Sequence, residues 1–169
     1  DKAEEGYGPA RNEDGTSMNK AWRVELDPTY LRREVSHILR LQSPKIHSNK
    51  IQDAVKETGP NFRMFAMTNF DMMSIGYYEG DDYYEPHQDL FMMTIICWFH
   101  HTPKLYTGGD FTFTDTDAKL ECNHNRMVMF PSYYRHAVHP IKKLNPFPAE
   151  MGWGRYGIQT FYGKKPNEN

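Results

Sequence analysis

The chain has 169 residues, a formal net charge of −2 at pH 7 and only two cysteines. This length suits a single domain with one hydrophobic core, and two cysteines exclude a disulfide scaffold or a cysteine-based zinc site. No apolar run is long enough to span a membrane, and no Lys/Arg cluster marks a nucleic-acid-binding protein. Because no secretory signal segment is found, a cytoplasmic location is expected. The sequence leaves the oligomeric state open.

The first 20 residues are polar and charged, and they contain little that could be buried. We therefore expect residues 1–20 to form a flexible tail, followed by a single domain over residues 21–169.

Two helices are predicted at the start of this domain. The first begins at Asp27, which can cap a helix, and has Pro28 at its first position. It is expected to end at Pro44, and its apolar residues share one face: Leu31, Val35, Ile38 and Leu39. The second helix is predicted over residues 48–59, with a serine as its cap and a Gly-Pro pair at its end.

From Asn61 onward, segments rich in Met, Phe, Tyr, Ile and Thr alternate with Gly, Pro, Asn and Asp turns. This alternation predicts nine short strands: 62–68, 72–78, 83–88, 91–99, 109–114, 118–121, 126–130, 136–140 and 155–162. The expected fold is mainly β, a double-stranded β-helix (jelly roll) with the N-terminal helices packed on one sheet. Residues 141–153 are expected to form a long functional loop.

One of the eight histidines lies in a His-x-Asp triplet, His87-Gln88-Asp89. Residues two apart on a strand face the same side, so this imidazole and carboxylate can bind one metal ion together. The third ligand must come from elsewhere in the chain. Two histidines and one carboxylate with open coordination positions are typical of non-haem Fe(II) oxygenases. The alternative is a surface pair at the end of a strand.

The context of this triplet is informative. Residues 72–163 resemble the Fe(II)- and 2-oxoglutarate-dependent dioxygenases, in particular their prolyl hydroxylase-like branch. Six segments resemble the family's motifs in the family's order: Ile75–Gly80, Tyr84–Asp89, Tyr106–Phe113, Asn125–Ser132, His136–Pro140 and Arg155–Tyr162.

The resemblance implies a set of site residues. The metal ligands, which are also catalytic, would be His87, Asp89 and His136. Arg155 would bind the distal carboxylate of 2-oxoglutarate, because its planar guanidinium suits a carboxylate. Two aromatic residues would contact the cosubstrate or substrate. Tyr77 matches a family tyrosine that lines the pocket, and Trp98 stands where the family often has a tyrosine that touches 2-oxoglutarate.

Two groups of residues compete for these roles. His139 lies three positions after His136, but an odd offset on a strand places it on the opposite face. Lys142 and Lys143 are rival anchors for 2-oxoglutarate, because the 19-residue separation of His136 and Arg155 is longer than the family usually shows. We favour His136 and Arg155, the latter because it begins a clean alternating strand.

The resemblance also implies the chemistry. The expected cofactors are Fe(II), 2-oxoglutarate and O2, with ascorbate as a candidate reductant, and the expected reaction hydroxylates an unactivated C–H bond and releases succinate and CO2. A prolyl residue of a peptide or protein is the expected substrate. Acidic and aromatic residues in 79–85 and 141–153 suggest an entrance that suits a basic peptide. Two alternatives are a hydroxylase of a small molecule, such as a free amino acid, and a non-catalytic β-sandwich binding module.

Overall fold

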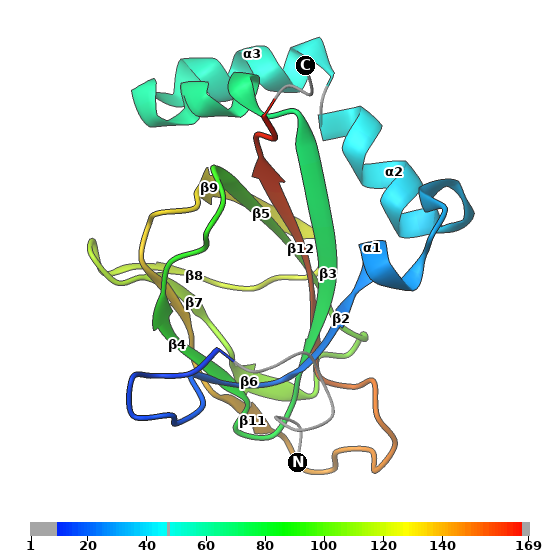
Figure 1. Cartoon of the computed structure of the whole chain (residues 1–169). Helices are drawn as coiled ribbons and strands as arrows, with labels where there is room; N and C mark the ends of the chain where they lie inside the picture. The colour runs from blue at the N-terminus through cyan, green and yellow to red at the C-terminus, as the bar shows by residue number, and fades with distance from the viewer. Residues whose placement is uncertain (1–9, 47, 167–169) are drawn as a thin grey trace.

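The computed structural model describes residues 10–46 and 48–166. Two five-stranded antiparallel sheets face one another, and a two-stranded sheet closes one end of the space between them (Figure 1). The larger sheet has the order β2 (Trp22–Glu25), β3 (Phe70–Tyr78), β12 (Arg155–Gly163), β5 (Met93–Phe99) and β9 (Arg126–Pro131). The smaller sheet has the order β1 (Asn19–Lys20), β4 (Tyr83–His87), β10 (His136–Val138), β7 (Phe111–Phe113) and β8 (Ala118–Leu120). The short sheet pairs β6 (Tyr106–Gly108) with β11 (Ile141–Lys143). The predicted mainly β jelly roll is thus confirmed.

Helical segments cover the outer face of the larger sheet (Figure 1). They are α1 (Leu26–Thr29), η1 (Arg33–Val35), α2 (His37–Ile46), α3 (Asn49–Thr58) and η2 (Pro60–Met67). Apolar side chains of these segments pack against β3, β5 and β12 in two buried clusters. None of the helices in the described part of the chain is long and apolar enough to cross a membrane.

Strand β12 shows how the sequence separates the two faces of this sheet. Every second residue points to one side, so Ile158 and Tyr162 pack under the helices. Residues of the opposite parity face the space between the sheets: Arg155, Gly157, Gln159 and Phe161. Trp98 of β5 lies opposite Gly157 of β12 in the register, and its side chain packs in the core between the sheets. The interior of the jelly roll therefore receives both apolar and charged side chains from the larger sheet.

Several local predictions differ from the structure. The single helix expected from Asp27 is divided into α1, η1 and α2, and the segment expected as a strand at 62–68 is the 3-10 helix η2. The expected loop 141–153 begins with strand β11. Strand β2, which was not predicted, forms an edge of the larger sheet.

The segment predicted as a tail is partly built into the fold. Residues 10–18 form a turn closed by backbone hydrogen bonds, including one from Met18 N to Ala10 O of 2.7 Å. Strand β1 then pairs with β4, and Asn12 donates a hydrogen bond to Glu85 at 3.1 Å. A polar segment can be ordered in this way because backbone pairing with a sheet edge satisfies its donors and acceptors. Residues 1–9 of the expected tail lie outside the described part of the chain.

A charged network attaches the helices to the sheet. The Arg33 guanidinium pairs with Asp71 of β3, whose side chain is 3% exposed, and its Nε lies 3.2 Å from Asp27 Oδ1. Asp27 Oδ2 in turn accepts a hydrogen bond from the backbone N–H of Met73 at 2.8 Å. The carboxylate of Asp27 thus binds the sheet instead of capping a long helix, which accounts for the short α1.

We expect Arg33→Ala to lower the free energy of unfolding by about 1–3 kcal/mol, because it leaves the buried Asp71 carboxylate without its cation. The matched control is Arg32→Ala, since Arg32 pairs with Glu34 on the surface and such pairs contribute less than about 1 kcal/mol. Urea denaturation measures both changes. Equal losses in the two variants would contradict the structural role of Arg33.

Candidate metal centre and the buried Arg155

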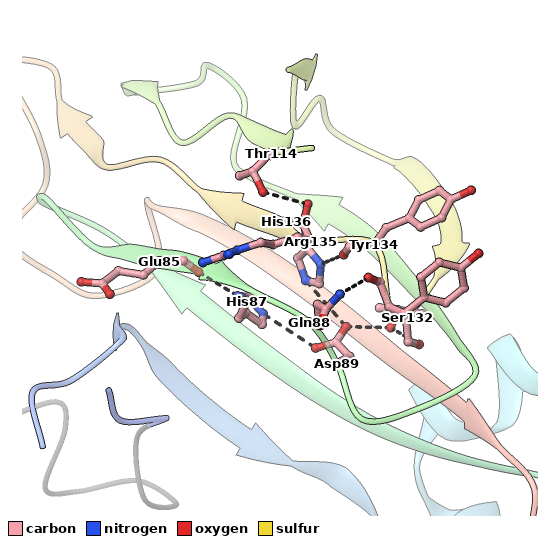
Figure 2. A network of polar contacts seen from close by, with 11 residues as sticks. Glu85, His87, Gln88, Asp89, Thr114, Ser132, Tyr134, Arg135 and His136 are labelled. Atoms are coloured by element: carbon pink, nitrogen blue, oxygen red, sulfur yellow. Dashed lines mark hydrogen bonds and ion pairs between the residues drawn. The ribbon is translucent and has the colours of Figure 1, made fainter. Parts of the chain in front are cut away.

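Three side chains from the smaller sheet converge on one point. His87 ends β4, Asp89 follows two residues later, and His136 begins β10, where it pairs directly with His87 in the antiparallel register. One ligand atom of each residue lies within 4.8 Å of the others. The Nε2 atoms of His87 and His136 lie 3.7 and 3.6 Å from the two oxygens of Asp89 (Figure 2). This arrangement offers two imidazole nitrogens and one carboxylate to a single ion from one side.

Hydrogen bonds to the backbone orient both imidazoles. Nδ1 of His87 donates to the carbonyl oxygen of Glu85, and Nδ1 of His136 donates to that of Tyr134, each at 2.8 Å (Figure 2). Because a carbonyl oxygen can only accept, each Nδ1 carries the proton and each neutral ring presents the lone pair of Nε2. Such bonds are what usually orient histidine ligands toward a metal.

The carboxylate of Asp89 is positioned from the larger sheet. Thr94 of β5 donates its hydroxyl hydrogen to Asp89 Oδ2 at 2.7 Å, and the Ser132 hydroxyl lies 2.8 Å from Thr94 Oγ1. Since the single hydrogen of Thr94 goes to the carboxylate, Ser132 donates to Thr94. The backbone N–H of Asp89 also bonds to the carbonyl of Ser132 at 3.0 Å. Asp89, which follows a strand of the smaller sheet, is therefore held in place by residues of the larger sheet.

Aromatic rings enclose the two histidines. The ring of Tyr84 stacks on His87 at 3.6 Å, while Phe111 and Phe130 flank His136 at 5.2 and 4.9 Å. Burial, together with the neighbouring His136, lowers the pKa of His87 to about 4. His87 is therefore neutral at pH 7, and a metal can bind it without displacing a proton.

Arg155 lies buried in the same interior with its charge unbalanced. Its side chain is 1% exposed, and Nη1 donates to the carbonyl of Gly109 and to the sulfur of Cys122. The guanidinium lies 4.5 Å from the ring centre of Tyr78. Its Nε has no hydrogen-bond partner, and no carboxylate forms an ion pair with it in residues 10–46 and 48–166. A buried cation without an anion is costly, so this site fits a carboxylate ligand such as that of 2-oxoglutarate.

The two aromatic residues expected to contact the cosubstrate lie on different faces. Trp98 is buried on the Arg155 side of the sheet and packs against Phe111 at 5.9 Å. Tyr77 lies on the other face, where its hydroxyl accepts hydrogen bonds from the backbone N–H groups of Gly152 and Gly154 and donates to Glu79. Burial raises the pKa of Tyr77 to about 12, so it remains a donor. The structure thus uses Tyr77 to hold the loop before β12.

Two tyrosines near Arg155 were missed by the sequence analysis. Tyr78, the neighbour of Tyr77, faces the guanidinium. The hydroxyl of Tyr106 is buried without a hydrogen-bond partner in the described chain, and burial raises its pKa. The signal for Tyr78 was available, because Tyr78 and Arg155 belong to strands that pair in register and only one residue of the Tyr77-Tyr78 pair can face inward.

The competing residues lie elsewhere. His139 is exposed, and its Nε2 lies 3.1 Å from the hydroxyl of Thr112. Lys142 and Lys143 are exposed on β11, and the ammonium of Lys143 lies 3.8 Å from Glu79 and 4.6 Å from the centre of the Phe147 ring. His139 is not a member of the cluster of potential metal ligands in the described chain.

Comparisons with known proteins identify the family. Residues 73–163, more than half of the chain, match the model of the 2OG-Fe(II) oxygenase superfamily. The chain therefore belongs to this superfamily, whose cofactors are Fe(II), 2-oxoglutarate and O2.

Solved structures share the fold at low sequence identity. A prolyl-4-hydroxylase from Pseudomonas putida matches with a TM-score of 0.61 and 16% identity, over 97% of this chain and 80% of that protein. An oxidoreductase of the 2OG-Fe(II) oxygenase family from Burkholderia pseudomallei matches with a TM-score of 0.51 and 12% identity, over 78% and 58% of the two chains. No curated protein sequence matches this chain significantly.

We expect Thr94→Val to weaken Fe(II) binding about 10–100-fold, because the substitution removes the hydroxyl that orients Asp89 while keeping the shape of the side chain. Thr160→Val is the matched control, since Thr160 is equally buried and its hydroxyl has no hydrogen-bond partner in the described chain. Anaerobic calorimetric titration measures both affinities. Equal affinities in the two variants would show that Thr94 does not orient the ligand.

We expect Arg155→Gln to weaken 2-oxoglutarate binding about 30-fold or more, the usual effect of removing one partner of a buried charge pair. Arg40→Gln, an exposed position on α2, serves as the control and should bind 2-oxoglutarate as the wild type does. Equilibrium binding to the Fe(II)-loaded protein without oxygen gives the dissociation constants. Unchanged affinity in Arg155→Gln would assign the anchor to another residue.

Proposed function

We propose that this oxygenase hydroxylates an unactivated C–H bond of a prolyl residue in a peptide or protein and releases succinate and CO2. The observation that carries the proposal is that the His87, Asp89 and His136 cluster shares one interior with the buried Arg155, whose charge meets no carboxylate among the described residues. A metal ligand set alone would suit many proteins, but a buried cation beside it adds a place for the second carboxylate of 2-oxoglutarate.

Each residue has a defined task in this proposal. Nε2 of His87, Nε2 of His136 and the carboxylate of Asp89 would hold Fe(II), and Arg155 would bind the distal carboxylate of 2-oxoglutarate. The bound iron and 2-oxoglutarate, with O2, supply the oxidising power for C–H hydroxylation. The surrounding aromatic rings keep water from the reacting centre, while Thr94 and the backbone carbonyls hold the ligands in place. Trp98 and Tyr106 would form walls of the cosubstrate chamber.

The shape of the substrate site supports a peptide. A cavity of about 810 Å³ includes His87 and Asp89 among its lining residues and extends to Ala10 and Met18 of the N-terminal segment. Leu90, which also lines it, is 97% exposed. A cavity with an exposed apolar rim suits an extended chain better than a small molecule, which is usually enclosed. The fold shared with a prolyl-4-hydroxylase is a further support for a prolyl substrate.

The test is the formation of succinate from 2-oxoglutarate with Fe(II) and O2, with and without a pool of proline-containing peptides. We expect turnover that the peptides stimulate, hydroxyproline in the products, and loss of turnover in Asp89→Ala. Asp53→Ala, an exposed carboxylate on α3, is the control and should retain activity.

The other outcomes separate the alternatives. Stimulation by free amino acids and not by peptides would replace the prolyl substrate with a small molecule. An absence of turnover, together with no rise in melting temperature on adding Fe(II), would contradict the metal site and leave a binding module.

A further inference from the structure

Two of the acidic residues expected at the entrance, Glu79 and Asp82, are used within the protein, whereas Asp81 is exposed. Glu79 accepts a hydrogen bond from the Tyr77 hydroxyl at 2.8 Å, and Asp82 is fully buried and accepts one from the backbone N–H of Glu79 at 2.9 Å. Tyr84 of the segment 79–85 lines the cavity that contains His87 and Asp89, but no acidic residue of 79–85 or 141–153 does so. The expectation that acidic side chains select a basic peptide therefore loses its structural basis.

The cavity is lined instead by two arginines, one from each sheet. Arg23 comes from β2 of the larger sheet, and Arg135 immediately precedes β10 of the smaller sheet. Arg135 extends toward β4, where its Nη2 lies 3.5 Å from the carbonyl oxygen of Pro86 (Figure 2). Among the residues that the structure describes, the lining contains one carboxylate besides that of the metal ligand Asp89, and it belongs to the exposed Asp115.

The side chain of Arg23 is held in a fixed direction. In the register of β2 and β3 it lies opposite Gly76. Its Nε donates to Glu25 at 2.8 Å, and its guanidinium carbon lies 5.4 Å from the ring centre of Phe161. The two Nη atoms make no hydrogen bond to the described residues, and the side chain is 35% exposed. One edge of the guanidinium is thus occupied, and the other remains available.

Two aromatic rings lie beside this guanidinium. Phe161 stacks with Phe91 at 5.0 Å between ring centres, and both residues line the cavity together with His87 and Asp89. The cavity therefore combines an apolar wall, which suits a pyrrolidine ring or another saturated carbon skeleton, with a cation at one side of that wall.

We propose that the substrate carries a carboxylate close to the C–H bond that reacts, and that Arg23 binds this carboxylate. Arg135, which also lines the cavity, adds a second positive charge. The planar guanidinium binds a carboxylate with two parallel hydrogen bonds, which fixes both the position and the orientation of the substrate. This inference rests on the proposed function, because it names the substrate class of the same site. The carboxylate belongs either to an Asp or Glu neighbouring the prolyl residue or to a free amino acid.

The experiment compares substrates that differ only in this charge. Peptides with Pro-Glu, Pro-Gln or Pro-Lys in an otherwise constant sequence, and free proline against prolinamide, are bound to the protein loaded with Fe(II) and 2-oxoglutarate without oxygen. Oxygen is then admitted, and hydroxylated product is measured. We expect the carboxylate-bearing member of a pair to bind about tenfold more tightly, as one charge-assisted contact provides. The peptide pairs and the proline pair distinguish the two sources of the carboxylate.

Three variants test the assignment to Arg23. In Arg23→Gln we expect the ratio of the Pro-Glu affinity to the Pro-Gln affinity to fall close to one. In Arg23→Lys, which keeps the charge without the planar guanidinium, we expect this ratio to take an intermediate value. Arg63→Gln, an exposed arginine of η2 outside the cavity, is the matched control and should keep the wild-type ratio and activity. The use of a ratio separates a loss of recognition from a general loss of folded protein.

The outcomes distinguish this inference from the proposed function. Equal binding of the charged and neutral members, a preference for Pro-Lys, or an equal loss for both members in Arg23→Gln would overturn the inference. Hydroxylation of prolyl peptides regardless of charge would leave the proposed function standing without it. A carboxylate preference that depends on Arg23, with no hydroxylation of any prolyl compound, would support the inference and overturn the prolyl substrate.

Discussion

The antiparallel register between β4 and β10 is the constraint on which the site depends. It places His136 directly opposite His87, although 49 positions separate them in the chain. Each imidazole is then turned by a hydrogen bond from Nδ1 to a backbone carbonyl two residues earlier. A shift of the register by one residue would move one histidine to the other face of the sheet. The ligand geometry is therefore a property of strand pairing, and local sequence adds the Asp89 carboxylate.

The larger sheet adds side chains to the site that the smaller sheet forms. Thr94 reaches across the interior to orient Asp89, and Arg155 brings a buried cation from the neighbouring strand β12. The Tyr78 ring stabilises the guanidinium by a cation–π contact, but such a contact is too weak to offset the full cost of burying a charge. The interior is thus incomplete in electrostatic terms, and 2-oxoglutarate bound as proposed above would balance the charge of Arg155. A jelly roll provides this arrangement because its two sheets face one shared core.

The sequence predicts the central strands of the larger sheet better than its edge strand β2 and the helical segments outside it. Strands β3, β5, β9 and β12 have strong apolar alternation and Gly or Pro turns at their ends, so they were found within a few residues. Strand β2 and the 3-10 helix η2 were missed because tertiary contacts determine them. The charged Trp22–Glu25 segment becomes a strand by pairing with β3, and the aromatic Pro60–Met67 segment forms a 3-10 helix whose Phe65 packs against Tyr162. The residues of the candidate site also differ in how well the sequence predicts them. The His-x-Asp triplet and the ordered motifs indicate the candidate metal ligands and Arg155. Thr94, Ser132 and Tyr106, which lie beside these residues in the structure, carry no local signal in the sequence.

The charge of the substrate cavity shows why the location of an acidic residue in the sequence is a poor guide to recognition. Glu79 and Asp82 lie close to the metal motif in the chain, yet backbone and hydroxyl donors turn them inward. Arg23 lies more than 60 positions before His87 in a segment without a clear pattern, yet β2 places it in the cavity. Arg23 lies opposite Gly76 in the register of β2 and β3, and a Cβ at Gly76 would lie 3.0 Å from the Gln159 side chain. The pairing of β2 with β3 therefore brings a cation from a distant part of the chain to the cavity that His87 and Asp89 also line.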